Sequence, residues 1–119
     1  MIYTTYFAML RKMPEDVVPI AVCARPPVNW DGLCVEELIP PYKDFQEWKG
    51  TGNNDKFAEQ YKKKVLNRLE PEVVSNWLQY LAEGRDVALV CYEKSSDFCH
   101  RHLIREWLNE HGIACEEWK

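Results

Sequence analysis

The stretch VALVCYEKSSDFCHRHLIREW, from Val87 to Trp107, changes its character twice. It opens with an apolar run that is typical of a strand buried on both faces. A polar loop follows, and the stretch closes with apolar residues at helical spacing, Leu103, Ile104 and Trp107. It therefore predicts a buried strand, over about Asp86 to Tyr92, that leads through a polar loop into an amphipathic helix.

The sequence on either side extends this alternation. Upstream, EPEVVSNWLQYLAEG predicts a helix with Pro71 in its first turn and Gly84 just past its end. Downstream, the amphipathic helix runs from about Cys99 to His111, Gly112 ends it, and IACEEW forms a short final strand. Helix, strand, helix and strand joined by short turns are typical of a parallel sheet that is covered by helices.

The first part of the chain carries two further strand signals. IYTTY (Ile2 to Tyr6) is rich in β-branched and aromatic residues and predicts a first strand. VVPIAVC (Val17 to Cys23) is a second apolar run. Because Pro19 cannot donate a hydrogen bond to a neighbouring strand, this strand is expected to start late or to lie at an edge. ARPPVNWDG then breaks the chain.

Two helices are expected between that break and Pro71. A short one lies around Asp44 to Trp48 and ends at Gly50. A longer one covers DKFAEQYKKKVLNRL, whose apolar residues recur every four positions, with Asn54 or Asp55 as its N-cap. The whole pattern predicts one α/β domain over residues 1–119: a three-layer sandwich with a small, mostly parallel sheet, Rossmann-like or flavodoxin-like, and helices on both faces.

The composition is that of an ordinary globular chain, with 119 residues of which 46% are hydrophobic and 29% charged. A formal net charge of −4 argues against nonspecific binding to nucleic acid, which needs a basic face, although Arg101 and Arg105 could form a local basic patch. No signal peptide and no membrane-spanning stretch is recognisable. Five cysteines in such a chain predict reduced thiols and a soluble cytoplasmic protein.

The expected strands also predict where a ligand would bind. In open parallel sheets, ligands gather outside the carboxyl ends of the strands. Three segments follow such ends here: YFA, CARPPVNW and CYEKSSDFCHRH. If the three strands are neighbours, these segments bring together Tyr6, Cys23, Arg25, Trp30, Cys91, Glu93, Cys99 and Arg101.

Cys99 is the candidate nucleophile of this group. It lies at the N-terminus of the last helix, where unpaired N–H groups and the helix dipole favour negative charge. With Arg101 and His100 nearby, its thiol could be ionised near neutral pH. The same N–H groups and Arg101 would equally bind a phosphate or carboxylate. Glu93, just past the strand, could accept a hydrogen bond from Arg101 or act as a general base.

Simpler interpretations remain open for several of these residues. Cys91, at the end of an apolar strand, is interpreted first as a packing residue, and Cys99 could be one as well. Arg101 could be an ordinary surface residue. His102 and Arg105 are expected on the solvated face of the last helix.

Two sharper alternatives concern the same segment. Zinc could be held by thiolate and imidazole ligands, although the spacing is weak evidence without a C-x-x-C pair. The candidate ligands are Cys91, Cys99, His100 and His102. CHRHLIR also matches the bare C-x5-R pattern of cysteine phosphatases. That chemistry needs a phosphate-cradling loop of glycine and small residues, whereas the pattern here contains bulky Leu103 and Ile104 in a helical sequence.

The segment LVCYEKSSDFCHRHLIREWL resembles the signature of the bacterial and phage family catalogued as domain of unknown function 488. Members of that family carry a strand ending in Cys-x-Glu, a short loop, and Cys-His-Arg opening a helix. The matching positions are Cys91, Glu93, Cys99, His100 and Arg101. The resemblance implies an α/β sandwich with its site at the Cys-His-Arg junction. Two segments depart from the family pattern: YFAML replaces a Gly-Tyr-Ser type turn, and CARPPVNW replaces an Asp-Val-Arg stretch, with Arg25 as the counterpart of its arginine.

These observations predict an enzyme first: a thiol- or acid/base-dependent hydrolase or transferase acting on a small anionic, nucleotide-like substrate. Cys99, Glu93 and His100 would be its catalytic residues. Arg101, Arg25 and Tyr6 would bind the anion. The alternatives are a noncatalytic module that holds an anion or a partner's acidic group, and a structural zinc protein. No cofactor and no metal is expected for the enzyme.

Overall fold

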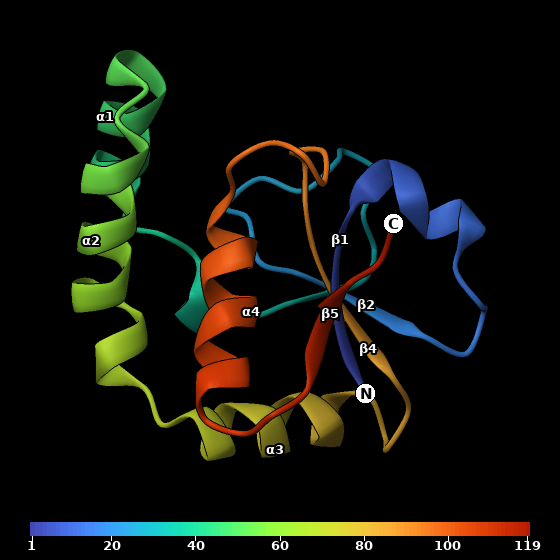
Figure 1. Ribbon diagram of the computed structural model, residues 1–119. Helices are drawn as coiled ribbons and strands as arrows, with labels where there is room; N and C mark the ends of the chain where they lie inside the picture. Colours follow the sequence, from blue (N-terminus) through green and yellow to red (C-terminus); the bar gives the residue numbers. More distant parts are fainter.

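The computed structural model describes all residues from Met1 to Lys119 and contains one five-stranded sheet with every strand parallel (Figure 1). The strand order across the sheet is β3-β2-β4-β1-β5. The strands are β1 Ile2–Tyr6, β2 Val18–Ala21, β3 Leu33–Cys34, β4 Val87–Cys91 and β5 Cys115–Glu117. The predicted strand in the VALVC segment is therefore the central one, with β2 on one side and β1 on the other.

Four α-helices and three short 3-10 helices surround this sheet. The α-helices are α1 Tyr42–Thr51, α2 Asn54–Lys64, α3 Pro71–Leu81 and α4 His100–Glu110. The 3-10 helices are η1 Phe7–Lys12, η2 Glu36–Leu38 and η3 Leu66–Arg68. None of the helices has both the length and the apolar character needed to cross a membrane.

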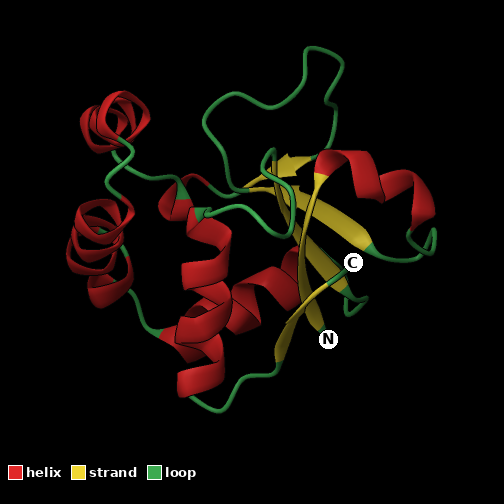
Figure 2. Ribbon diagram, turned by 45° about the horizontal axis from the view of Figure 1, so that its top comes forward, coloured by secondary structure: helices red, strands yellow, loops and turns green.

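The direction of the strand connections decides which face each helix covers. From β1 the chain crosses β4 to reach β2, whereas the connections from β3 to β4 and from β4 to β5 run toward the opposite edge of the sheet. Because such crossovers are right-handed, η1 lies on one face and α3 and α4 on the other. Figure 2 shows the sheet between η1 and the α-helices, with α1 and α2 beyond α4.

The predicted α/β sandwich with a parallel sheet is therefore confirmed, but its two outer layers are unequal. All four α-helices lie on one side, and η1 alone covers the other. The strand order also differs from both predicted topologies, since the Rossmann order is 3-2-1-4-5-6 and the flavodoxin order is 2-1-3-4-5. The likeness to those folds is limited to the parallel sheet and its helical covering.

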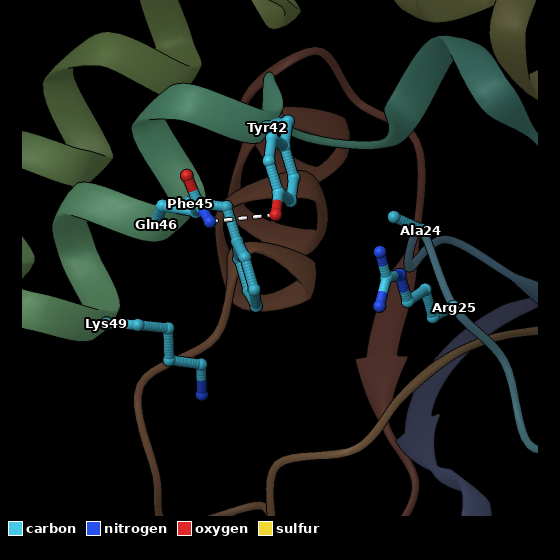
Figure 3. Close-up of a pocket in the computed structure, with 6 residues that line it drawn as sticks. All are labelled: Ala24, Arg25, Tyr42, Phe45, Gln46 and Lys49. Atoms are coloured by element: carbon cyan, nitrogen blue, oxygen red, sulfur yellow. Dashed lines mark hydrogen bonds between the residues drawn. The ribbon is translucent and has the colours of Figure 1, made fainter.

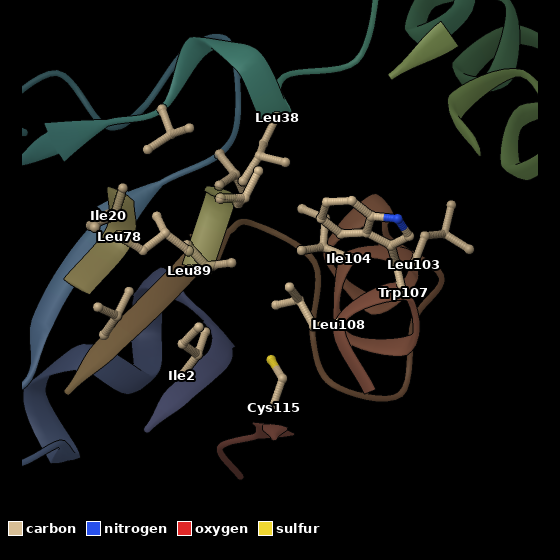
Figure 4. Close-up of a cluster of buried hydrophobic side chains, with 14 of the residues drawn as sticks. Ile2, Ile20, Leu38, Leu78, Leu89, Leu103, Ile104, Trp107, Leu108 and Cys115 are labelled. Carbon is tan, nitrogen blue, oxygen red and sulfur yellow. The ribbon is translucent and has the colours of Figure 1, made fainter. Parts of the chain in front are cut away.

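The larger hydrophobic core joins the sheet to α3 and α4. Ile2, Ile20 and Leu89 project from three adjacent strands toward Leu78 of α3 and Ile104 of α4 (Figure 4). Complete burial of each such side chain stabilises the fold by about 1.5–3 kcal/mol. This core fixes the orientation of α4, and therefore of the segment that leads into its first turn.

A smaller core lies on the opposite face of the sheet. Ala88, which alternates with the inward-facing Val87 and Leu89, packs there against Met13 and Val17. Because both faces of β4 are covered, all five of its residues are buried. This explains the near-continuous apolar run in its sequence.

Pro19 differs from its predicted place at an edge or outside the strand. It lies inside β2, which pairs with β4 on one side and β3 on the other. The Val18 N–H donates to the Asp86 carbonyl on the β4 side, so position 19 faces the β3 side. β3 begins to pair only at Ile20, and the missing donor of Pro19 therefore faces no strand partner.

Two helix boundaries also differ from the predictions. α1 ends at Thr51 and is capped by Gly52 and not by Gly50, because Gly52 adopts the left-handed conformation, with φ of 68°, that ends helices. The N-cap of α2 is Asn53, whose side-chain oxygen accepts a hydrogen bond from the Lys56 backbone N–H at 3.1 Å.

The predicted continuation of α2 to Leu69 is wrong, because the α-helix ends at Lys64 and η3 follows it. Leu66 in η3 is buried in the larger core. Further along, Pro71 disfavours a helical conformation at Glu70, which has φ of −97° and ψ of 119°. The chain therefore leaves the helix before α3 begins.

Candidate functional site

The carboxyl end of β4 brings the ends of its two neighbours together with the first turn of α4. Tyr6 at the end of β1 pairs with Cys91, and Ala21 at the end of β2 pairs with Val90. The strand ends that were expected to converge are thus direct neighbours. The chain then passes through residues 92–99 and enters α4 with Cys99 as the N-cap residue.

Cys91, Cys99 and His100 form a buried cluster at this junction. The Nδ1 atom of His100 lies 3.8 Å from the Cys99 sulfur and 4.0 Å from the Cys91 sulfur. Its Nε2 atom lies 2.7 Å from the Val22 carbonyl oxygen, so Nε2 carries a proton and donates to that oxygen. The imidazole is thereby held with Nδ1 facing the Cys99 sulfur, while the Cys91 sulfur lies beside the ring, 3.6 Å from Nε2. The Tyr61 ring packs edge-on against the imidazole, with 5.4 Å between the ring centroids.

The pKa values of the two thiols of the cluster are shifted in opposite directions. The pKa of Cys99 is lowered well below its ordinary value by a hydrogen bond from Cys91, by His100 and by the backbone N–H of Arg101, which together outweigh burial. The pKa of Cys91 is raised well above its ordinary value by burial and by the neighbouring Cys99. Of the two thiols, Cys99 is therefore the one that ionises more readily, with Cys91 as the hydrogen-bond donor to it.

Glu93 adjoins the thiolate from the loop that follows β4. Burial raises its pKa, and the negative charge of Cys99 and a hydrogen bond with that residue raise it further. Lys49 of α1 opposes this shift from 3.6 Å away. The side chain of Glu93 is 20% exposed, so it lies between the buried thiolate and the surface. A carboxyl group with a raised pKa in this place is suited to give and take protons near neutral pH.

Arg101 has a partner that its expected role as an anion clamp did not include. Its Nε and Nη2 atoms donate to the two carboxylate oxygens of Glu117 at 3.2 and 2.8 Å, and both side chains are almost completely buried. Burial alone would raise the pKa of Glu117, but hydrogen bonds from Arg101, Thr4 and Ser95 outweigh it and lower that pKa.

The other edge of the guanidinium is unpaired. Its Nη1 atom is buried and has no hydrogen-bond partner. Its Cζ atom lies 5.9 Å from the centre of the Tyr6 ring, which places Tyr6 against the cation. The positive charge of Arg101 also acts on Cys91, where it lowers the pKa of the thiol and so opposes part of the rise that burial causes. Arg101 thus lies beside the thiol cluster, with one edge held by Glu117 and Nη1 without a partner within the protein.

Arg25 lies apart from this cluster, on the long loop after β2. It lines a cavity of about 410 Å³ together with Ala24 and with four residues of α1, Tyr42, Phe45, Gln46 and Lys49 (Figure 3). The Tyr92 hydroxyl donates to the Arg25 carbonyl at 2.6 Å and ties this loop to the segment that carries Glu93. Lys49 contacts Glu93, so the cavity adjoins the thiol cluster through that pair.

Several residues of the site were not expected from the sequence. Nothing in the sequence assigns Lys49 and the aromatic residues of α1 to the site, because the sequence does not show where this helix packs in the fold. Glu117 carried a weak one: it is an acidic residue in the short final strand, paired with Thr4 in the middle of β1. An acid at such a position requires a buried cation nearby.

The two alternative chemistries of the segment find limited support in the geometry. Cys91, Cys99 and His100 present three ligand atoms within 4.8 Å of one another, one short of the four ligands of a structural zinc site. His102 does not join them, since its Nε2 atom contacts the Asp97 carbonyl at 3.2 Å. The C-x5-R pattern forms no phosphate cradle, because every residue from His100 to Arg105 is helical.

Comparison with known proteins gives a family and no individual relative. No curated protein and no solved structure matches the chain significantly. The sequence profile of the Active DUF488-N3 subclade matches residues 2–112, a range that contains β1 to β4 and the complete thiol cluster. The match covers nearly the whole chain, and the protein therefore belongs to the DUF488 family, within its Active DUF488-N3 subclade.

Proposed function

We propose that this protein is a thiol-dependent hydrolase or transferase that acts on a small anionic substrate, with Cys99 as its nucleophile. The observation that carries the proposal is the position of the Cys99 sulfur, beside Cys91 and 3.8 Å from Nδ1 of His100, two neighbours that lower its pKa. A thiolate is the nucleophilic form of cysteine. The description of the family as an active subclade agrees with a retained reaction but names none.

The proposed reaction has two steps. The Cys99 sulfur attacks an electrophilic centre of the substrate and forms a covalent bond to it, while the leaving group departs with the proton of the Glu93 carboxyl. In the second step, Glu93 as a carboxylate takes a proton from water or from an acceptor hydroxyl, whose oxygen attacks the same centre and releases Cys99 as a thiolate. His100, held by the Val22 carbonyl, donates from Nδ1 to the thiolate when the imidazole is protonated.

Arg101 has a binding role in this proposal. Its Nη1 atom has no partner within the protein and is the donor left for negative charge that develops on the substrate. Its other edge is fixed by Glu117, so the guanidinium does not have to reorganise during the reaction. Tyr6, against the guanidinium, helps to fix its plane.

Access to Cys99 requires motion of the covering loop. The Cys99 side chain is buried, and Glu93 is the member of the cluster that reaches the surface. Residues 92–98 contain no helix or strand and carry Glu93 and Ser95 at partly exposed positions. We infer that this loop moves aside when substrate binds, as covering loops do in many enzymes.

The noncatalytic alternative, an anion-binding module, has less support. Such a module would use Arg101 and the N-terminus of α4, but Glu117 already occupies two of the donors of Arg101 and balances its charge. At the helix N-terminus, the thiolate of Cys99 itself occupies the place of an anion. These contacts favour a reactive Cys99 thiolate over a noncatalytic site that binds an anionic ligand.

The mechanism also implies a compartment. All five cysteines are free, and the proposed reaction requires Cys99 in its reduced form. We infer a reducing environment, such as the cytoplasm, as the place where the protein works.

The first test measures the ionisation of Cys99 directly. Thiolate absorbance at 240 nm, followed as a function of pH, is expected to show a step at lower pH than an ordinary cysteine gives, in the natural protein and in Cys115→Ser. Cys115 is a matched control because burial raises its pKa to about 12. Cys99→Ser should lack the step. If the natural protein shows no thiolate step earlier than that of an ordinary cysteine, the nucleophile assignment is wrong.

The second test separates catalysis from binding. Small activated esters, p-nitrophenyl acetate and p-nitrophenyl phosphate, are incubated with the protein, and adducts are mapped by mass spectrometry. An acyl or phosphoryl adduct on Cys99 that accumulates in Glu93→Gln more than in the natural protein supports the two-step reaction, because the variant lacks the base that hydrolyses the adduct. The absence of any Cys99 adduct with either compound, at a pH where the thiolate is present, would support the binding module instead.

A further inference from the structure

The cavity beside α1 has the chemistry of a substrate pocket for the site proposed above. Its lining contains two cations, Arg25 and Lys49, and no acidic residue. This local excess is notable in a chain with 19 acidic and 15 basic residues. Its volume of about 410 Å³ lies within the range of about 300–1,000 Å³ that is typical of small-molecule sites.

Arg25 is the cation of this cavity that has no protein partner. Its guanidinium makes no hydrogen bond and no ion pair, while its backbone carbonyl is anchored by the Tyr92 hydroxyl. The side chain reaches from the loop after β2 toward Tyr42 and Phe45 of α1 (Figure 3). A free guanidinium on an anchored backbone is suited to bind a phosphate through two parallel hydrogen bonds.

The opposite wall offers aromatic surface. Tyr42 is 60% exposed, and its hydroxyl accepts a hydrogen bond from the Gln46 side chain at 2.8 Å, which restricts its ring (Figure 3). Phe45 lies one turn away on the same helix and lines the same cavity. The exposed Tyr42 ring and the half-buried Phe45 ring are suited to contact a flat heterocycle.

Lys49 connects the cavity to the reactive groups. Its ammonium lies 3.6 Å from the Glu93 carboxylate and 5.4 Å from the centre of the Phe45 ring. Glu93 in turn shares a hydrogen bond with Cys99. A ligand in the cavity therefore lies beside the proton donor that the proposed reaction uses.

We propose that this cavity binds a nucleoside monophosphate, with the base against Tyr42 and Phe45 and the phosphate on Arg25. The inference rests on the proposed function for its catalytic meaning, since it names the substrate class of that same site. Binding itself needs only the cavity. Because Arg25 and Tyr42 are exposed and belong to neither hydrophobic core, their substitution is expected to leave the fold intact.

The test is calorimetric titration with the 5′-monophosphates of adenosine, guanosine, cytidine and uridine. Adenosine alone and inorganic phosphate alone serve as ligands that carry one half of the chemistry. At least one nucleotide is expected to bind, and more tightly than either half. Loss of a bidentate charged contact in Arg25→Ala should weaken binding about ten- to hundredfold. Arg68→Ala, an exposed arginine of η3, is the matched control and should bind as the natural protein does.

Three outcomes would overturn the inference: no nucleotide binds at millimolar concentration, Arg25→Ala binds unchanged, or inorganic phosphate binds as tightly as the nucleotide. A Tyr42→Ala variant that retains full affinity would likewise refute the proposed contact between the nucleotide base and Tyr42. Titration of Cys99→Ser keeps this result separate from the proposed function. Unchanged binding by that variant supports the pocket even if Cys99 proves to be an ordinary thiol. If Cys99 ionises as proposed but no nucleotide binds, only the pocket is refuted.

Discussion

His100 and Val22 are joined by a hydrogen bond of 2.7 Å between the imidazole Nε2 and the backbone carbonyl, although 78 residues separate them in the chain. The bond connects the first turn of α4 to the end of β2. Because Nε2 is committed to the carbonyl, Nδ1 is left to face the Cys99 sulfur. A backbone contact thus decides which atom of the histidine is available to Cys99, as is common for functional histidines.

Replacement of His100 by phenylalanine is expected to raise the pKa of Cys99. The ring volume is kept, but the donor to the thiolate and the partner of the Val22 carbonyl are lost. The thiolate step at 240 nm should move to higher pH, and the free energy of unfolding should fall by about 1–3 kcal/mol because a buried carbonyl is left unpaired. Urea unfolding measures the second effect.

His111→Phe is the matched control for that variant. His111 also contacts a carbonyl, that of Trp107 at 2.8 Å, but it lies at the opposite end of α4. Its replacement should leave the thiolate step where it is. A thiolate step that stays in place in His100→Phe would show that the imidazole does not stabilise Cys99.

Cys91 is expected to control the acidity of Cys99 through a single hydrogen bond. In Cys91→Ala the donor is absent, and the pKa of Cys99 should rise, since this bond is the largest cause of its depression. In Cys91→Ser a hydroxyl replaces the thiol, and much of the depression should remain. The two variants are compared by absorbance at 240 nm. Equal positions of the thiolate step in both would contradict the role of Cys91 as the donor.

The elements that build the site were predictable wherever their own residues carry the pattern. β4 is buried on both faces and reads as an apolar run, and α4 shows an apolar stripe that packs on the sheet. β3 was not predictable. It has two residues, both exposed, and it exists because Ile20 and Ala21 of β2 offer it a partner. Pairing of this kind depends on the tertiary fold and leaves no local signal.

The same distinction applies to the site. Cys99, His100 and Glu93 are close in sequence, so a strand followed by a helix was enough to group them. The contact of Arg101 with Glu117 depends on β5 lying next to β1, and no local pattern contains it. Lys49 reaches Glu93 only because α1 packs beside the loop after β4, where Trp48 and Phe98 are in contact with 5.6 Å between ring centroids.

Zinc is expected to bind at most weakly to this protein. The cluster offers three donors where a structural zinc site has four. Protein purified without added metal should contain far less than one zinc per chain by elemental analysis, and a chelator should leave its Tm unchanged. One equivalent of zinc that resists dialysis, together with a fall in Tm on chelation, would show that the thiols serve a metal.

The Arg101–Glu117 pair is expected to be necessary for the fold. Arg101→Met leaves the Glu117 carboxylate buried without its main partner, and such a loss typically costs about 3–5 kcal/mol. Glu117→Gln should cost a comparable amount, because it leaves the cation unpaired. The double variant should lose less than the sum of the two, since neither charge is then left alone. Additive losses, measured by urea unfolding, would show that the two charges are not coupled.

The depressed pKa of Glu117 also predicts how stability changes with pH. The pKa of this carboxyl is lower in the folded protein than its value of about 4.3 in an unfolded chain. The unfolded state therefore binds the proton more readily, and Glu117 contributes stability that is fully present above about pH 4.3. That contribution is lost as the pH falls through the folded-state pKa. Glu117→Gln should remove this part of the acid sensitivity, whereas Glu116→Gln, an exposed neighbour, should retain it. Urea unfolding at a series of pH values between 3 and 7 measures the difference. If the natural protein and Glu117→Gln lose stability in parallel below pH 5, carboxyls other than Glu117 govern acid unfolding.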